Sequence, residues 1–170
     1  MLNFVGNPPE RPKKKGVVVK SRDEIAKLCL EEPHIIISLY CTDDTPAEIP
    51  ALGCTEGILR IMIDDIDDNH RKYINASERY TFFNHEHAIK IKEFLESFPD
   101  VYWIICQCDA GISRSSGLAA AISLFYNGDD REFFTGLRYH PNRLVYRTAL
   151  NVLIPTTLPK NASSEASPQA

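Results

Sequence analysis

Two uninterrupted apolar runs constrain the fold of this 170-residue chain most strongly. His34–Tyr40 reads HIIISLY and Val101–Cys106 reads VYWIIC, and each run has the length of a strand. A strand that is apolar at nearly every position is covered on both faces, as in a parallel sheet, whereas a half-exposed strand alternates with polar residues. The shorter apolar runs Gly16–Val19 and Ile58–Ile63 predict two further strands of the same sheet.

Segments with the apolar spacing of helices separate these runs. Ser21 and Glu24 form a capping box for a helix over about 22–31, and Asn84 can cap a helix that Pro99 ends. Further helices are expected over Ser115–Phe125, from Asp129 to about Leu137, and from Pro141 onward. Strands that alternate with helices predict an α/β fold: a single domain with a central, mainly parallel sheet and helices on both faces. Ligands of such folds bind at the carboxyl ends of the strands.

The composition narrows the class of protein. We expect an N-terminal arm over residues 1–15, one domain over 16–155 and a polar tail over 156–170. A net charge of −4 disfavours a nucleic-acid partner, which binds a basic surface. No apolar run approaches the ~20 residues that insert into and span a membrane. An odd number of cysteines, five, and the absence of a signal-peptide pattern predict free thiols and a cytoplasmic protein.

One junction between a strand and a helix carries a chemical signature. Cys108 follows the Val101–Cys106 run, and Arg114 begins the next helix, so the five residues between them can curl their N–H groups around one centre. Gly111 permits the left-handed backbone that such a curl requires. The helix N-terminus attracts an anion, and the planar fork of Arg114 suits a tetrahedral oxyanion. The same field favours the thiolate form of Cys108, so the junction predicts a nucleophile inside an anion-binding loop.

A second match to the same spacing tests how specific the signature is. Cys54 and Arg60 are also separated by five residues, with Gly57 at the position that corresponds to Gly111. Arg60 falls inside an expected strand, however, and no helix start follows it. That stretch lacks the helix dipole and the free N–H groups of an anion site, so we interpret it as a chance match.

The motif Cys108–Ser115 resembles the signature of the protein tyrosine phosphatase superfamily, and its Ala110–Ser115 core is most similar to the dual-specificity branch. The stretch 58–67 precedes it at a distance suited to the family's general-acid loop, and 140–142 (His-Pro-Asn) is similar to an element that braces the phosphate loop. The overall likeness is to small bacterial and phage tyrosine-phosphatase-like proteins. The resemblance covers 16–155 and implies a phosphoprotein phosphatase that forms a phosphocysteine intermediate without a cofactor or metal.

The resemblance also implies a role for individual residues. Cys108 would attack phosphorus, Arg114 would bind the phosphoryl oxygens, and Ser115 would hydrogen-bond the thiolate and ease its departure. Asn142 would brace the loop. Substrate-binding N–H groups would come from Asp109, Ala110, Gly111, Ile112, Ser113 and Arg114. From the residues alone, Ser115 could be the N-cap of the helix, and it could fill both roles at once.

Four neighbouring carboxylates compete for the role of general acid, which must protonate the leaving oxygen. Asp65 best matches the family's Asp–Ile element, and Asp64, Asp67 and Asp68 remain alternatives. Those that take no part would form a solvated acidic turn.

One position departs from the family pattern. Gln107 stands where the family usually has a histidine before the nucleophile, and an amide can hydrogen-bond the loop but cannot carry charge. We expect Gln107 to support the loop while favouring the thiolate less strongly. Either Cys106 or Cys41 could form a protective disulfide with Cys108, although buried packing thiols are the simpler interpretation.

Other classes of function remain open at this stage. A non-catalytic module that binds phosphate or a phosphopeptide would keep Arg114 and lose the nucleophile or the acid. A rhodanese-like or arsenate-reductase-like thiol enzyme would also carry a cysteine on a strand–helix loop. The sequence does not choose between phosphotyrosine and phosphoserine or phosphothreonine, and it names no oligomeric partner.

Overall fold

The computed structural model describes residues 13–67, 73 and 79–155. Asp68, residues 1–12 of the expected arm and the expected tail over 156–170 lie outside the described residues. In the described part of the chain, no helix is both long enough and apolar enough to cross a membrane.

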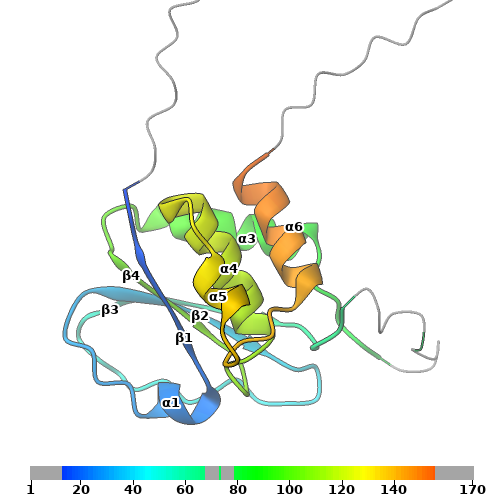
Figure 1. The fold of residues 1–170 in the computed structure, drawn as a ribbon. Coiled ribbons are helices and arrows are strands. Elements are labelled where there is room, and N and C mark those ends of the chain that lie inside the picture. Colours follow the sequence, from blue (N-terminus) through cyan, green and yellow to red (C-terminus); the bar gives the residue numbers. More distant parts are fainter. Residues whose placement is uncertain (1–12, 68–72, 74–78, 156–170) are drawn as a thin grey trace, which may run out of the picture.

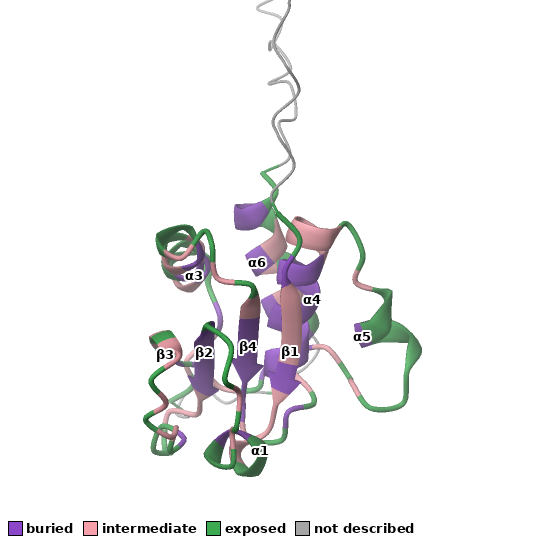
Figure 2. Ribbon diagram, turned by 90° about the vertical axis from the view of Figure 1, so that its left-hand side faces the viewer, coloured by how far each residue is buried: buried purple, intermediate pink, exposed green. Residues whose placement is uncertain are grey.

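The described strands form one four-stranded sheet with the order β1-β4-β2-β3, and every neighbouring pair is parallel. The strands are β1 (Gly16–Lys20), β2 (His34–Tyr40), β3 (Thr55–Met62) and β4 (Trp103–Gln107). The two uninterrupted apolar runs are the central strands β2 and β4, which are buried along almost their whole length (Figure 2). The edge strands β1 and β3 are more exposed, so the prediction of a parallel sheet with buried central strands is confirmed.

Four helices pack on one face of the sheet (Figure 1). They are α3 (His85–Ser97), α4 (Arg114–Asn127), α5 (Arg131–Thr135) and α6 (Arg143–Leu153). Alternate residues of the central strands, such as Ile37 and Ile104, join these helices in the larger core. The intervening residues Ile36 and Ile105 point to the other face, where they pack with Ile25 of the short helix α1 (Arg22–Ala26). Helices therefore cover both faces, as expected, but very unequally.

Several helix boundaries differ from the sequence prediction. The capping box of Ser21 and Glu24 is present, but α1 ends at Ala26, so the prediction of a helix to residue 31 is wrong. Leu28 and Leu30 leave the helix and pack against the smaller core as loop residues. This tertiary packing outweighs their helix propensity.

The last helix begins later than predicted. Asn142 is its N-cap and accepts a hydrogen bond from the N–H of Val145 at 3.0 Å, so Pro141 precedes the helix instead of opening it. The parallel arrangement brings the carboxyl ends of all four strands to one edge of the sheet, where the candidate site lies.

Candidate active site

The loop between β4 and α4 is curled against the turn that follows β1. Gly111 has φ +66°, and a Cβ atom at this position would lie 2.8 Å from the backbone nitrogen of Ser21. The N–H of Cys108 donates to the carbonyl of Lys20 at 3.3 Å, and the N–H of Arg22 donates to the carbonyl of Asp109 at 3.0 Å. The left-handed backbone expected at Gly111 is therefore present. Because glycine has no Cβ atom, the loop can also approach the backbone of Ser21 more closely than any other residue would allow.

Cys108 is 2% exposed, and its Sγ lies 2.9 Å from the Oγ of Ser115, which is fully buried. Either the Ser115 hydroxyl or the Cys108 thiol can donate this hydrogen bond. The N-cap of α4 is Ser113, because the helix already begins at Arg114. The interpretation of Ser115 as the N-cap is therefore wrong, and its hydroxyl faces the sulfur of Cys108.

Arg114 is 3% exposed and is held by three acceptors. Its Nη2 donates to Oδ2 of Asp109 at 2.7 Å, and its Nη1 donates to the carbonyl of Ile63 at 2.9 Å and to Sγ of Cys41 at 3.2 Å. Its Nε is buried and has no partner among the described residues. A guanidinium group has five N–H bonds. The Nε–H and one Nη2 N–H thus remain for a ligand, and these are the donors of a bidentate contact to an oxyanion.

The charge of Arg114 is secured by its surroundings. Burial acts to lower the pKa of its guanidinium, but the hydrogen bond to Asp109 and the nearby acidic groups raise the pKa above its ordinary value. Arg114 is therefore a permanent cation at the base of the loop.

Arg22 extends this network to the rim of the site. Its Nε and Nη2 donate to Oδ1 of Asp109 at 3.1 and 2.9 Å, and Nη2 also donates to Oδ2 of Asp44 at 2.6 Å. Burial acts to raise the pKa of Asp109, but its hydrogen bonds to Arg114 and Arg22 lower the pKa overall. Sequence reasoning did not single out Arg22. Its position directly after the capping Ser21, at the carboxyl end of a parallel strand, was the available signal.

Two neighbouring aspartates differ sharply in their hydrogen bonds. Asp64 accepts bonds from the N–H of Thr42 at 3.0 Å, the Oγ1 of Thr42 at 2.5 Å and the N–H of Thr81 at 2.7 Å. Burial acts to raise the pKa of Asp64, but these hydrogen bonds lower it overall. Asp64 is therefore a structural carboxylate that joins two loops, and it is a poor proton donor.

Asp65 is exposed and contacts the loop between β4 and α4 through Ser113. Its Oδ1 accepts bonds from the Oγ of Ser113 at 2.7 Å and from the Nδ2 of Asn142 at 2.9 Å. A pocket of about 150 Å³ lies beside the loop, and its lining includes Asp65, Asp67, Ser113 and Asn142. The structure therefore places Asp65 and Asp67 near the loop.

Asn142 links the loop to α6. Its backbone N–H donates to the carbonyl of Ser113 at 3.0 Å, and the N–H of His140 donates to the carbonyl of Ile112 at 3.0 Å. A Cβ atom on Gly117 would lie 2.6 Å from the carbonyl oxygen of Asn142, so glycine lets α4 approach this segment closely. The segment 140–142 thus contacts the loop between β4 and α4 through its backbone.

Gln107 is 1% exposed, and its Oε1 accepts a hydrogen bond from the Oγ of Ser38 at 2.6 Å. Its Nε2 has no partner among the described residues. The side chain therefore joins β4 to β2 and makes no hydrogen bond to the loop that follows it.

All five cysteines are free. Burial raises the pKa of the Cys106 thiol well above its ordinary range, as expected for a packing residue. Cys41 contacts Arg114 directly, and burial raises the pKa of its thiol as well. Cys54 donates to the carbonyl of Leu30 at 2.8 Å. Arg60 lies inside β3, which continues to Met62, so no helix begins next to it, and this agrees with a chance match.

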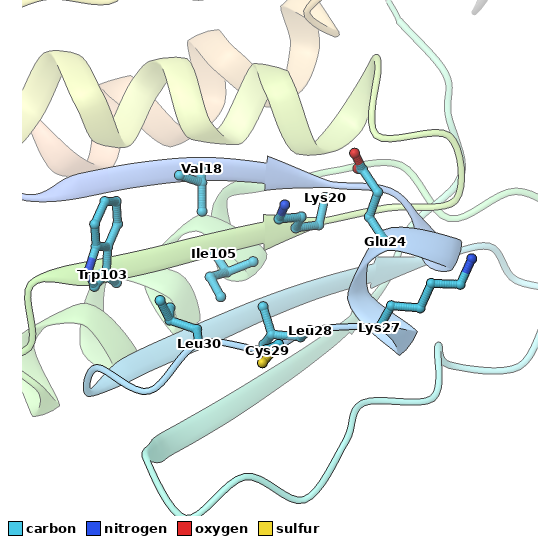
Figure 3. Close-up of a pocket in the computed structure, with 9 residues that line it drawn as sticks. All are labelled: Val18, Lys20, Glu24, Lys27, Leu28, Cys29, Leu30, Trp103 and Ile105. Carbon is cyan, nitrogen blue, oxygen red and sulfur yellow. The ribbon is translucent and has the colours of Figure 1, made fainter.

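A larger cavity of about 390 Å³ lies on the opposite face of the sheet (Figure 3). Trp103, Ile105, Leu28 and Leu30 form apolar parts of its wall, and neither Cys108 nor Arg114 lines it. In the part of the chain that the structure describes, no three or more His, Cys, Asp or Glu side chains are grouped as metal ligands would be.

The sequence matches no family model and no curated protein. Its fold is similar to that of the human tyrosine phosphatase-like serine/threonine/tyrosine-interacting protein, with a TM-score of 0.52 and 17% identity over 82% of this chain and 94% of that chain. A mouse candidate dual specificity phosphatase, complexed with zinc tungstate, has a TM-score of 0.49 and 13% identity over 87% of this chain and 91% of its own. The chain therefore has a tyrosine phosphatase-like fold, in agreement with the fold that the motif at Cys108–Ser115 implied.

Proposed function

We propose that the chain is a cysteine-dependent phosphatase of the dual-specificity-like branch of the protein tyrosine phosphatases, and that it hydrolyses phosphomonoesters on proteins. The observation that carries this proposal is the Sγ of Cys108 at 2.9 Å from the Oγ of Ser115, in the same loop as a buried Arg114 whose Nε lacks a partner in the described chain. One loop therefore carries a nucleophilic sulfur and a guanidinium N–H that is available to an anion. This combination suits phosphoryl transfer, which depends on positioning and charge stabilisation.

In the first step of the proposed reaction, the Cys108 thiolate attacks phosphorus, and the bond between phosphorus and the leaving oxygen breaks. Arg114 and the N–H groups of the loop bind the phosphoryl oxygens and stabilise their charge. Asp65 transfers its proton to the leaving oxygen, so the dephosphorylated side chain leaves as a neutral phenol or alcohol. Cys108 then carries the phosphoryl group.

In the second step, water attacks the phosphocysteine, and the Asp65 carboxylate accepts a proton from that water. The bond between sulfur and phosphorus breaks, which releases inorganic phosphate and returns Cys108 as a thiolate. The Ser115 hydroxyl donates to the departing sulfur and lowers the barrier of this step. Apart from the substrate and this water, both proposed steps use side chains and N–H groups of the chain.

The side chains of the loop favour a compact phosphoryl group. Ala110 and Ile112 are exposed on the loop, and the one charged side chain between Cys108 and Arg114 is the acidic Asp109. The loop itself therefore adds no second cation for a polyphosphorylated ligand, and Arg22 at the rim is already bound to Asp109 and Asp44. We therefore propose phosphotyrosine in proteins as the substrate, with phosphoserine and phosphothreonine as an extension, and a reducing, cytoplasmic location for the free thiols.

Hydrolysis of an aryl phosphate by the full chain tests the proposal. Wild type should be active with or without a chelator, and Cys108→Ser should lose at least about 10³-fold in activity. Cys54→Ser is the matched control, because Cys54 has the same spacing to an arginine but lies outside the loop. The control should keep the activity of wild type.

Other outcomes would point to the competing functions. A wild type that binds inorganic tungstate but hydrolyses nothing at any pH would be a non-catalytic phosphate-binding module. Chelator-sensitive activity that survives Cys108→Ser would indicate a metal enzyme. Sulfur transfer or arsenate reduction that requires Cys108, without phosphatase activity, would indicate a thiol enzyme of the rhodanese or arsenate-reductase kind.

A further inference from the structure

Arg22 contacts the phosphate loop through both its backbone and its side chain. Its N–H donates to the carbonyl of Asp109 at 3.0 Å, and its guanidinium donates twice to Oδ1 of the same residue. On the other side, Nη2 of Arg22 donates to Oδ2 of Asp44 at 2.6 Å and to the carbonyl of Thr45 at 2.8 Å. Arg22 therefore ties the phosphate loop to the segment that follows β2.

Asp109 divides its carboxylate between two arginines. Oδ1 faces Arg22, whereas Oδ2 accepts from Nη2 of Arg114 at 2.7 Å. The Asp109 side chain is about one-third exposed and that of Arg114 is 4% exposed, so the inner contact is well shielded from water. This contact orients the guanidinium of Arg114 and leaves its Nε, which has no partner among the described residues, for an anion.

The same contact also carries a cost. A carboxylate beside Arg114 neutralises part of the charge that should attract an anion, and it repels the anion directly. Arg22 offsets this effect because it supplies a second positive charge to Asp109 on the side away from Arg114. With Arg22 in place, Asp109 orients Arg114 and exerts less repulsion on a bound oxyanion.

We propose that Arg22 is a positioning residue of the anion site, which acts through Asp109 to orient Arg114 and to preserve its charge for the ligand. The inference deepens the proposed phosphatase function, since it assigns to that site a residue outside the Cys108–Ser115 motif. Arg22 itself need not touch the substrate.

The experiment measures the affinity for inorganic tungstate by calorimetry, in the full chain with Cys108→Ser, so that the binding measured does not depend on the nucleophile. In this background, Arg22→Ala should weaken tungstate binding by about 10-fold, because the carboxylate of Asp109 is then opposed by Arg114 alone. Arg22→Lys, which retains a positive charge, should restore binding to within about 3-fold of the parent.

The route through Asp109 is tested by a double-mutant cycle. When Asp109→Asn is already present, Arg22→Ala should change tungstate affinity by less than about 2-fold, because there is no carboxylate left to hold or neutralise. Arg138→Ala is the matched control. Arg138 also ties α1 to another loop, through Oε1 of Glu24 at 3.2 Å, but it makes no hydrogen bond to the phosphate loop.

Three results would overturn the proposal. The first is an affinity that Arg22→Ala leaves within about 2-fold of the parent, and the second is an equal loss in both Asp109 backgrounds. The third is an equal loss caused by Arg138→Ala, which would mean that the position of α1 matters and not the charge on Asp109. Because the readout is binding in the absence of Cys108, a chain that fails to hydrolyse aryl phosphates would disprove the proposed catalysis and leave this test intact.

Discussion

The side-chain amide of Asn142 donates to Oδ1 of Asp65 at 2.9 Å, and so it joins the cap of α6 to the candidate general acid. Ser113 donates to the same oxygen at 2.7 Å. Both bonds end on Oδ1, so Oδ2 is the oxygen that the proposed proton transfer would use. The last helix and the phosphate loop thus position one carboxyl group together.

Asp65→Asn should lower kcat/KM for a phosphotyrosine peptide by about 10²- to 10³-fold, because the leaving oxygen then departs without a proton. The loss should be much smaller for an aryl phosphate whose phenol is acidic. Measuring both substrates on the same preparation separates proton donation from folding. Equal losses with the two leaving groups would remove Asp65 from this role.

Ser115→Ala should lower kcat by about 10- to 100-fold, because it removes a hydrogen bond of 2.9 Å to a charged sulfur. The effect should fall mainly on breakdown of the phosphocysteine, in which sulfur is the leaving group. A rapid-quench experiment should therefore show a burst of released phenol followed by slow turnover. A variant with no burst and an unchanged kcat would contradict this role.

Gly111→Ala should destabilise the fold by about 2–4 kcal/mol, because an L residue is strained at φ +66° and its Cβ would lie 2.8 Å from the nitrogen of Ser21. Gly128→Ala is the matched control, since Gly128 has φ +74° but no atom within 4 Å of the added Cβ. The control should cost only the strain, about 1 kcal/mol. Urea unfolding of the two variants measures the difference, and equal losses would show that the approach to Ser21 has no energetic effect.

Asp64→Asn should destabilise the fold at pH 7 by about 1–3 kcal/mol, because the hydrogen bonds from Thr42 and Thr81 lose a charged acceptor. The folded state lowers the pKa of Asp64, so its contribution to stability is present above the ordinary carboxyl pKa near 4 and is lost as the pH falls through the lower, folded value. The gap in unfolding free energy between wild type and variant should therefore narrow between pH 5 and pH 3. A gap that stays constant over this range would contradict the lowered pKa.

The sheet could be predicted from the sequence because a strand that is buried on both faces is apolar at nearly every position. His34–Tyr40 matches β2 residue for residue, and Val101–Cys106 overlaps β4 (Trp103–Gln107). The predicted helix after Ser21 is too long, because a capping box marks where a helix starts and does not determine where it ends. Its end depends on where Leu28 can reach the smaller core, which is a property of the folded chain.

Only part of the candidate site could be predicted from the sequence, for a related reason. Cys108, Arg114 and Ser115 lie in one short motif, so their spacing predicts a shared loop. Asp64 and Asp65 are adjacent in the chain after β3, and successive side chains of an extended segment point in opposite directions. Composition cannot tell which of two identical residues faces the loop. Arg22 belongs to no motif, because its contact with Asp109 spans 87 positions of the chain.

Arg114 obtains its partners from segments that become neighbours only when the sheet is complete. Ile63 follows β3, Cys41 follows β2 and Asp109 follows β4, while the loop rests on the carbonyl of Lys20 in β1. A partly folded chain in which any one of these strands is detached therefore lacks an intact anion site. Phosphate should bind the native state alone and stabilise it, by about 2.7 kcal/mol at a concentration 100 times its dissociation constant. Bound phosphate would then report selectively on the fully assembled sheet and would stabilise it against unfolding.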